Sequence, residues 1–142
     1  MIDELELFIF INKCKHLKHK FLGIYAADNY PLNLKENTFI IVNSDKSNQL
    51  GTHWLLLCNR DNKYLFGDPL GLPITYYPHI CDRLSFADFD VKEIIKSPLQ
   101  KLDSNLWGLF CIYIAHYVFS AYFPLIPYIS ETELSRFVKH LT

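Results

Sequence analysis

The chain has 142 residues and is 50% hydrophobic, which is enough for one buried core, so we expect a single domain over residues 1–142. It has 14 Lys and Arg against 15 Asp and Glu, so its overall charge gives no sign of a nucleic-acid-binding surface or of attraction to a charged membrane. Its four cysteines include no CxxC pair, which excludes a dense disulfide scaffold and favours an intracellular protein with reduced thiols.

The N-terminal region is expected to be helical. Apolar residues recur at helical spacing from Leu5 to Leu17, which predicts a helix over residues 3–18 that covers the rest of the domain. The first residues are acidic, unlike the basic start of a secretory signal. One group of metal-ligating residue types lies in this region, but no fourth ligand is apparent, so neither a metal nor another cofactor is expected: Cys14, His16 and His19.

The middle of the chain is expected to form a sheet. A short extended segment at 21–25 precedes three runs rich in β-branched and aromatic residues, at 38–43, 53–58 and 63–66. The polar stretches between them favour turns, and Arg60–Asn62 is typical of a hairpin turn. These runs predict the centre of a mostly antiparallel sheet.

The second half of the chain is expected to add helices and one edge strand. Residues 77–84 are expected to form a short helix, and residues 91–95 an edge strand. Ser130 followed by Glu133 is a capping-box signature for a last helix that ends near His140. With no internal repeat or linker, the pattern predicts an α+β domain whose central sheet is clasped by helices.

The apolar stretch near the C-terminus has two interpretations. No Asp, Glu, Lys or Arg occurs between Asp103 and Glu131, and this length could span a bilayer. However, the stretch contains His116, several tyrosines and two prolines, and no basic cluster flanks it. We therefore expect a helix that starts near Asn105 and is buried within the core, and we do not expect membrane insertion.

Two residues far apart in the sequence are expected to form a pair. His53 opens an otherwise apolar strand, and Asp68 comes just after the neighbouring strand. A hairpin between these strands would bring the carboxylate beside the imidazole. A carboxylate in that place fixes the tautomer of a histidine and stabilises the imidazolium, as a catalytic base requires.

A third candidate element lies at the start of the apolar helix. Gln100 is followed seven positions later by Trp107 and Gly108. A side-chain amide together with backbone N–H groups at a helix N-terminus is the arrangement that stabilises an oxyanion. A thiolate at the first helical turn would also be favoured by the helix dipole. Position 107 would suit a cysteine, but the tryptophan found there has no ionisable group and cannot attack a carbonyl.

Taken together, these motifs resemble those of the adenovirus endopeptidase (adenain) family, which also occurs in Polinton-type mobile elements. A more distant resemblance links the chain to the proteases of ubiquitin-like modifiers. The resemblance spans about Leu5 to Phe123 and implies a papain-like or adenain-like cysteine protease fold. The segments that carry it follow in the family's order: Lys20–Tyr25, Gly51–Trp54, Tyr64–Gly71, Gln100 and Asp103–Cys111.

The resemblance also implies a role for each candidate residue. His53 would be the base, Asp68 would orient it, and Gln100 would help to form the oxyanion hole with the backbone N–H groups of Trp107 and Gly108. Position 107 would hold the nucleophilic cysteine that this chain lacks. A second cysteine of the motif, Cys111, lies one helical turn further on, about 6 Å along the axis, and we expect it to belong to the core.

Three functions follow as expectations. The first is a catalytically inactive pseudoprotease whose cleft binds a viral or element-encoded protein or peptide, such as a capsid or core protein. The second is an active viral maturation endopeptidase inactivated by substitution at position 107. The third is a membrane-associated or structural virion protein. The resemblance places such a protein in the host cytoplasm or nucleus, or within a virion.

Overall fold

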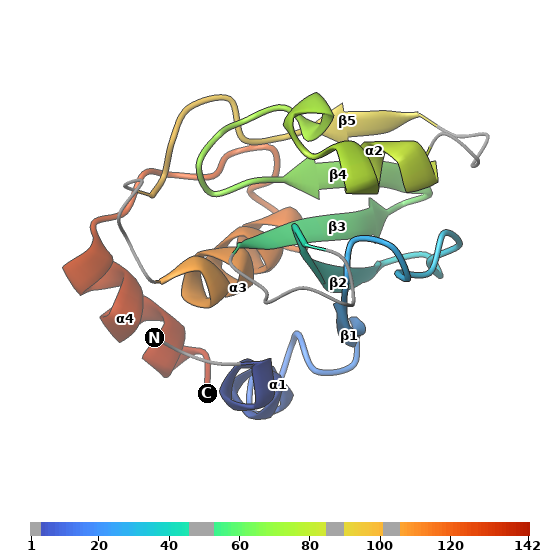
Figure 1. The fold of residues 1–142 in the computed structure, drawn as a ribbon. Coiled ribbons are helices and arrows are strands. Elements are labelled where there is room, and N and C mark those ends of the chain that lie inside the picture. Colours follow the sequence, from blue (N-terminus) through green and yellow to red (C-terminus); the bar gives the residue numbers. More distant parts are fainter. Residues whose placement is uncertain (1–3, 46–52, 85–89, 101–105) are drawn as a thin grey trace.

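The computed structural model describes residues 4–45, 53–84, 90–100 and 106–142. The described residues form one sheet with helices packed around it (Figure 1). In chain order the elements are α1 Glu4–Asn12, β1 Phe21–Tyr25, β2 Thr38–Asn43, β3 Trp54–Arg60, β4 Lys63–Gly67, the 3-10 helix η1 Ile74–Tyr76, α2 Pro78–Leu84, β5 Val91–Glu93, α3 Trp107–Val118 and α4 Glu131–His140.

The five strands lie side by side in sequence order, β1-β2-β3-β4-β5. The three central strands are antiparallel, whereas β1 pairs parallel to β2 and β5 pairs parallel to β4. Parallel neighbours need a longer connection, and residues 26–37 and 68–90 supply it. The sheet is therefore mixed, with an antiparallel centre, and the α+β fold class is confirmed.

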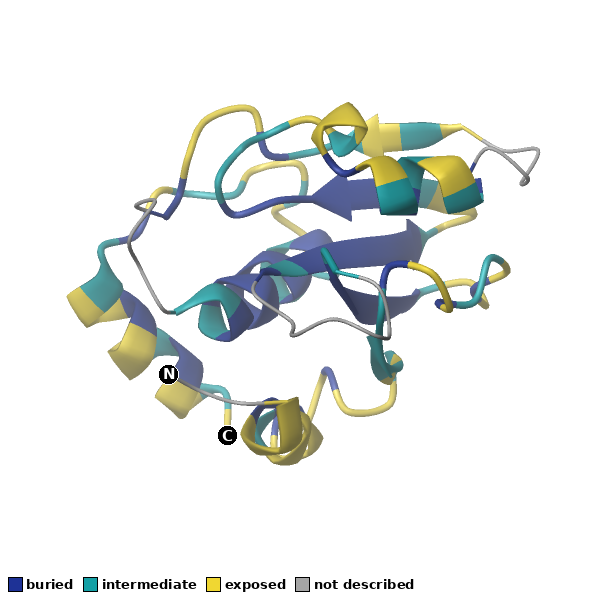
Figure 2. Ribbon diagram, viewed as in Figure 1, coloured by how far each residue is buried: buried dark blue, intermediate teal, exposed yellow. Residues whose placement is uncertain are grey.

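Both faces of the sheet are covered, so β2 is buried throughout and β3 is buried except at its two end residues (Figure 2). Because side chains alternate along a strand, Phe39 and Ile41 belong to the cluster with α1, α3 and α4, whereas Ile40 and Val42 belong to the cluster with α2. Strands buried on both faces form continuous apolar runs in the sequence, as these do.

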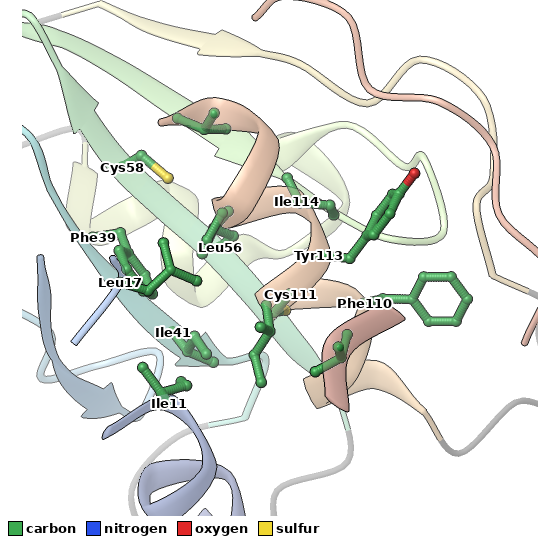
Figure 3. Packing of buried hydrophobic residues seen from close by; sticks show 14 of the residues in the cluster. Ile11, Leu17, Phe39, Ile41, Leu56, Cys58, Phe110, Cys111, Tyr113 and Ile114 are labelled. Atoms are coloured by element: carbon green, nitrogen blue, oxygen red, sulfur yellow. The ribbon is translucent and has the colours of Figure 1, made fainter. Parts of the chain in front are cut away.

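Helix α3 runs through the larger of these clusters (Figure 3). Most of its residues are buried, including Phe110, Cys111 and Ile114, and it contacts both β3 and α4. The expectation of a buried apolar helix is thus confirmed. In the part of the chain that is described, no helix is long and apolar enough to cross a membrane.

Helix α1 ends earlier than the sequence pattern predicts. It stops at Asn12, and the chain then forms turns, in which Cys14 N–H donates to Ile11 C=O and Leu17 N–H donates to Cys14 C=O. Ile11, Cys14 and Leu17 are fully buried. Their spacing of three residues suits turns with i to i−3 hydrogen bonds, which keep one apolar side facing the core without an α-helix.

Two local predictions are confirmed. The β3–β4 hairpin turns at Asp61 and Asn62, whose φ angles of 51° and 65° are positive, as tight hairpin turns require. At the start of α4, Ser130 Oγ accepts the N–H of Glu133 at 3.2 Å, as a capping residue does.

Candidate functional site

The β3–β4 hairpin brings the first two candidate residues together. His53 immediately precedes β3 and Asp68 immediately follows β4, so both lie at the open end of the β3–β4 hairpin. His53 Nε2 lies 2.9 Å from Asp68 Oδ1, and the two residues are only 6% and 1% exposed. The predicted hydrogen-bond contact between them is confirmed.

Asp68 is held by two further donors. Its Oδ1 also accepts the N–H of Leu70 at 2.9 Å, and its Oδ2 accepts the hydroxyl of Tyr77 at 2.5 Å. The Tyr77 ring stacks on His53, with centroids 5.5 Å apart. Sequence reasoning missed Tyr77, because only the path of the chain between β4 and α2 brings it back to the hairpin edge.

These contacts define the protonation of His53. A carboxylate can only accept, so Nε2 carries the proton that is donated to Asp68, and Nδ1 carries the lone pair. Nδ1 is buried and has no hydrogen-bond partner among the described residues. Burial lowers the pKa of His53 and outweighs the opposing effect of Asp68, so the ring is neutral at pH 7. Its Nδ1 is the atom that would accept a proton from a nucleophile.

Trp107 occupies the place beside this base. It is the first residue of α3, as predicted, and it is half-buried. Its ring meets that of His53 edge to face, at an interplanar angle of 85° and with centroids 3.0 Å apart. Aromatic pairs usually keep their centroids about 4.5–7 Å apart. The indole therefore packs directly against the imidazole.

The backbone of Gln100 is hydrogen-bonded to the turn that follows Asp68. The N–H groups of Leu99 and Gln100 both donate to the carbonyl of Pro69, at 2.8 and 3.1 Å. In the same turn, Gly71 has φ +73°, and a Cβ there would lie 2.9 Å from the carbonyl carbon of Ser97, so only glycine fits. The side chain of Gln100 is 4% exposed.

The backbone groups that the sequence predicts for an oxyanion hole lie at the start of α3. Trp107 and Gly108 lie in its first turn, where N–H groups have no acceptor within the helix, and Leu106 gives no side-chain cap. The roles of these N–H groups and of the Gln100 amide in holding an oxyanion remain predictions.

Three of the four cysteines are buried. Cys111 is fully buried in the core (Figure 3), and burial, with smaller contributions from Asp68 and Cys58, raises the pKa of its thiol well above the ordinary value. Cys14 and Cys58 are also buried, with thiol pKa values raised for the same reason. Cys81, on α2, is partly exposed. The described residues hold no cluster of three or more His, Cys, Asp or Glu placed to bind an ion.

The lowered pKa of His53 predicts a stability loss in acid. Below pH 6.5 the unfolded chain takes up a proton that the folded His53 resists, so unfolding becomes easier as the pH falls. For one histidine with an ordinary pKa in the unfolded chain, the loss of unfolding free energy between pH 7.5 and 5.5 is at most about 1.4 kcal/mol. Urea unfolding at both pH values, for the unchanged protein and for His53→Gln, measures it.

The variant should show the smaller loss of unfolding free energy between the two pH values. His16 and His116 also have pKa values lowered mainly by burial, but their contribution is common to both proteins and cancels in the comparison. Equal pH dependence in the two proteins would show that His53 takes up its proton as readily in the folded state as in the unfolded chain.

The fold and the site together define an α+β domain with a buried histidine–carboxylate pair beside a helix N-terminus. No protein-family model matches the chain, and no curated protein sequence does. Among solved structures, the crystal structure of the selenomethionine ASFV pS273R protease is similar, with a TM-score of 0.42 and 18% identity over 72% of this chain. The chain covers 43% of that protease, less than half of its length.

Proposed function

We propose that this protein is a catalytically inactive relative of the cysteine endopeptidases and acts by binding an extended segment of a partner protein. The observation that carries the proposal is the contact between Trp107 and His53. His53 and Asp68, which would be the base and its orienting carboxylate, are hydrogen-bonded. The position that would supply the nucleophile holds an indole that packs against His53. Following the resemblance, the partner is a viral or element-encoded protein.

The chemistry of the site supports the loss of catalysis. Peptide hydrolysis by a cysteine protease needs a thiolate beside the base, and the base alone supplies a small part of the acceleration. The nearest thiol along α3, Cys111, is buried and protonated. His53 and Asp68 are also nearly inaccessible to a substrate.

A groove near Gln100 supports the binding function. It has a volume of about 340 Å³ and lies between residues 94–99 and the segment that contains Pro124, Ile126 and Tyr128. Tyr128 is 72% exposed. Lys96 and Ser97 also line the groove. Apolar side chains with a few polar groups beside them are typical of sites that bind the apolar anchors of a peptide.

One observation favours a second candidate. The His53–Asp68 hydrogen bond and the two further donors to Asp68 are present although position 107 holds tryptophan. This observation favours an active endopeptidase with cysteine at position 107. The present sequence would then be an inactivated form of that enzyme. The two candidates share the fold and the groove, and they differ in what Trp107→Cys can do.

Selection of displayed peptides tests the proposed function. We expect the protein to select peptides with apolar or aromatic anchors and to leave them uncut when they are incubated with it and analysed by mass spectrometry. Ile126→Glu places a charge in the groove and should weaken binding of a selected peptide at least about tenfold, or by about 1.4 kcal/mol.

The matched control is Leu5→Glu, which adds the same charge at an exposed apolar residue on α1, in a different groove. It should leave the affinity unchanged. Failure to select any peptide, or equal affinity for Ile126→Glu and the unchanged protein, would contradict the binding role. Cleavage of a selected peptide that thiol alkylation blocks would contradict the loss of catalysis and point to Cys111.

A further inference from the structure

Two histidines that are 100 residues apart in the sequence meet on the side of the sheet covered by α1 and α3. His16 lies in the turns after α1, and His116 lies in the last turn of α3. Their nitrogens, His16 Nε2 and His116 Nδ1, are 2.8 Å apart. The rings meet edge to face, with centroids 4.9 Å apart and an interplanar angle of 84°.

The His116 ring is held by aromatic neighbours, whereas the His16 ring is exposed to solvent. His116 is half-buried, and its ring is in edge contact with Phe137 of α4 at 5.2 Å and with Tyr117 at 5.1 Å between centroids. His16 is exposed and near Lys20, whose positive charge acts on it. One imidazole is therefore preorganised, and the other reaches it from solvent.

The grouping differs from the one that the sequence alone indicated. Cys14 is fully buried, and its thiol points back to the carbonyl of Phe10 at 3.5 Å. It is therefore not available to a ligand beside His16. The partner of His16 comes from another part of the chain, at a separation that sequence spacing does not reveal.

The spacing of the two nitrogens is close to that of two ligands of one metal ion. Zinc binds imidazole nitrogen at about 2.0–2.1 Å, so two tetrahedral nitrogen ligands lie about 3.3 Å apart. The pair needs to open by only about 0.5 Å. The proton now shared between the rings would move to the outer nitrogen of its own ring, so that both inner nitrogens present lone pairs.

We propose that His16 and His116 form a two-histidine site for a divalent first-row transition-metal ion, with Zn²⁺ as the ion to test. Imidazole is a favoured ligand for this class of ion, and water molecules would complete the coordination. The bound ion would fasten the turns after α1 to the end of α3. This inference is independent of the proposed function, because it uses neither the His53 site nor the groove.

Calorimetric titration of ZnCl₂ into the full chain, dialysed first against EDTA at pH 7.5, tests the proposal. We expect one ion per chain, and at least about tenfold weaker binding for His16→Ala, since one of two protein ligands is lost. Zn²⁺ should also raise the Tm of the unchanged protein, because it binds only the folded arrangement. His16 is exposed, so the variant should fold normally.

Two controls separate this pair from other ligands. His19→Ala removes an exposed histidine three positions away, and Cys81→Ala removes the partly exposed thiol. Both should bind Zn²⁺ as the unchanged protein does. The proposal is overturned if the unchanged protein binds no Zn²⁺, if His16→Ala binds it equally well, or if either control loses binding to the same degree as His16→Ala.

Discussion

Trp107→Cys is expected to create a thiol that alkylates at pH 7 at least about tenfold faster than the partly exposed Cys81. The new thiol would stand in the first turn of α3, where the helix dipole favours an anion. It would also lie beside His53, whose buried Nδ1 has no hydrogen-bond partner among the described residues. The dipole stabilises the thiolate, and Nδ1 can accept the proton that the thiol loses. Iodoacetamide labelling followed by peptide mass spectrometry gives the rate at each cysteine.

The comparison depends on a folded variant and a matched control. Trp107 packs against His53, and replacing a packed aromatic residue by a small one costs about 3 kcal/mol. Circular dichroism should therefore precede the labelling. The control is Trp107→Cys combined with His53→Gln, which keeps the helix N-terminus and removes the base. Most of the rate advantage should disappear in it.

The same variant distinguishes the two candidate functions. If Trp107→Cys cleaves peptides that the unchanged protein only binds, the base, Asp68 and the oxyanion groups are intact, and the endopeptidase candidate gains support. If the thiol is reactive but nothing is cleaved, the site retains its base and has lost substrate access, as the pseudoprotease proposal expects. A thiol that reacts no faster than Cys81 would mean that the site has been remodelled.

Asp68→Ala is expected to lower the free energy of unfolding by about 3–5 kcal/mol, the largest stability effect at this site. The carboxylate accepts from three donors, His53 Nε2, Leu70 N–H and the Tyr77 hydroxyl, and all three would lose their acceptor. Asp68 is almost fully buried, so water cannot easily replace it. Urea unfolding monitored by tryptophan fluorescence measures the loss.

Tyr77→Phe is the matched control for that variant. It removes one of the three hydrogen bonds and keeps the aromatic ring that stacks on His53. A hydrogen bond to a charged group contributes about 1.5–3 kcal/mol, so the control should lose clearly less than Asp68→Ala. If Asp68→Ala unfolds no more easily than Tyr77→Phe, the carboxylate is not the centre of the network.

The strands and the His53–Asp68 pair could be predicted from the sequence because local pattern determines them. Apolar runs with β-branched or aromatic residues, bounded by polar turns, identify β2, β3 and β4, and a short turn at Asp61 leaves one register for the hairpin. Once the hairpin is assigned, His53 and Asp68 at its open end must be neighbours. The α+β class follows from the same elements.

Other features depend on how distant segments pack. Tyr77 reaches Asp68 only after the chain has turned at Gly71, and His116 meets His16 only because the turns after α1 lie against the end of α3. The parallel pairing of β1 with β2, and of β5 with β4, likewise depends on long connections. Periodicity along a single segment contains no information about these contacts.

The pKa of the new thiol in Trp107→Cys tests the central claim most directly. It shows whether His53 can still act as a base toward a cysteine at position 107. The ultraviolet absorbance of the thiolate, followed against pH in a Cys81→Ser background, gives this pKa. We predict a value at least about one unit below the ordinary 8.5 of cysteine, and a return toward 8.5 when His53 is also replaced by Gln. A pKa at or above 8.5 that does not respond to His53→Gln would contradict the account.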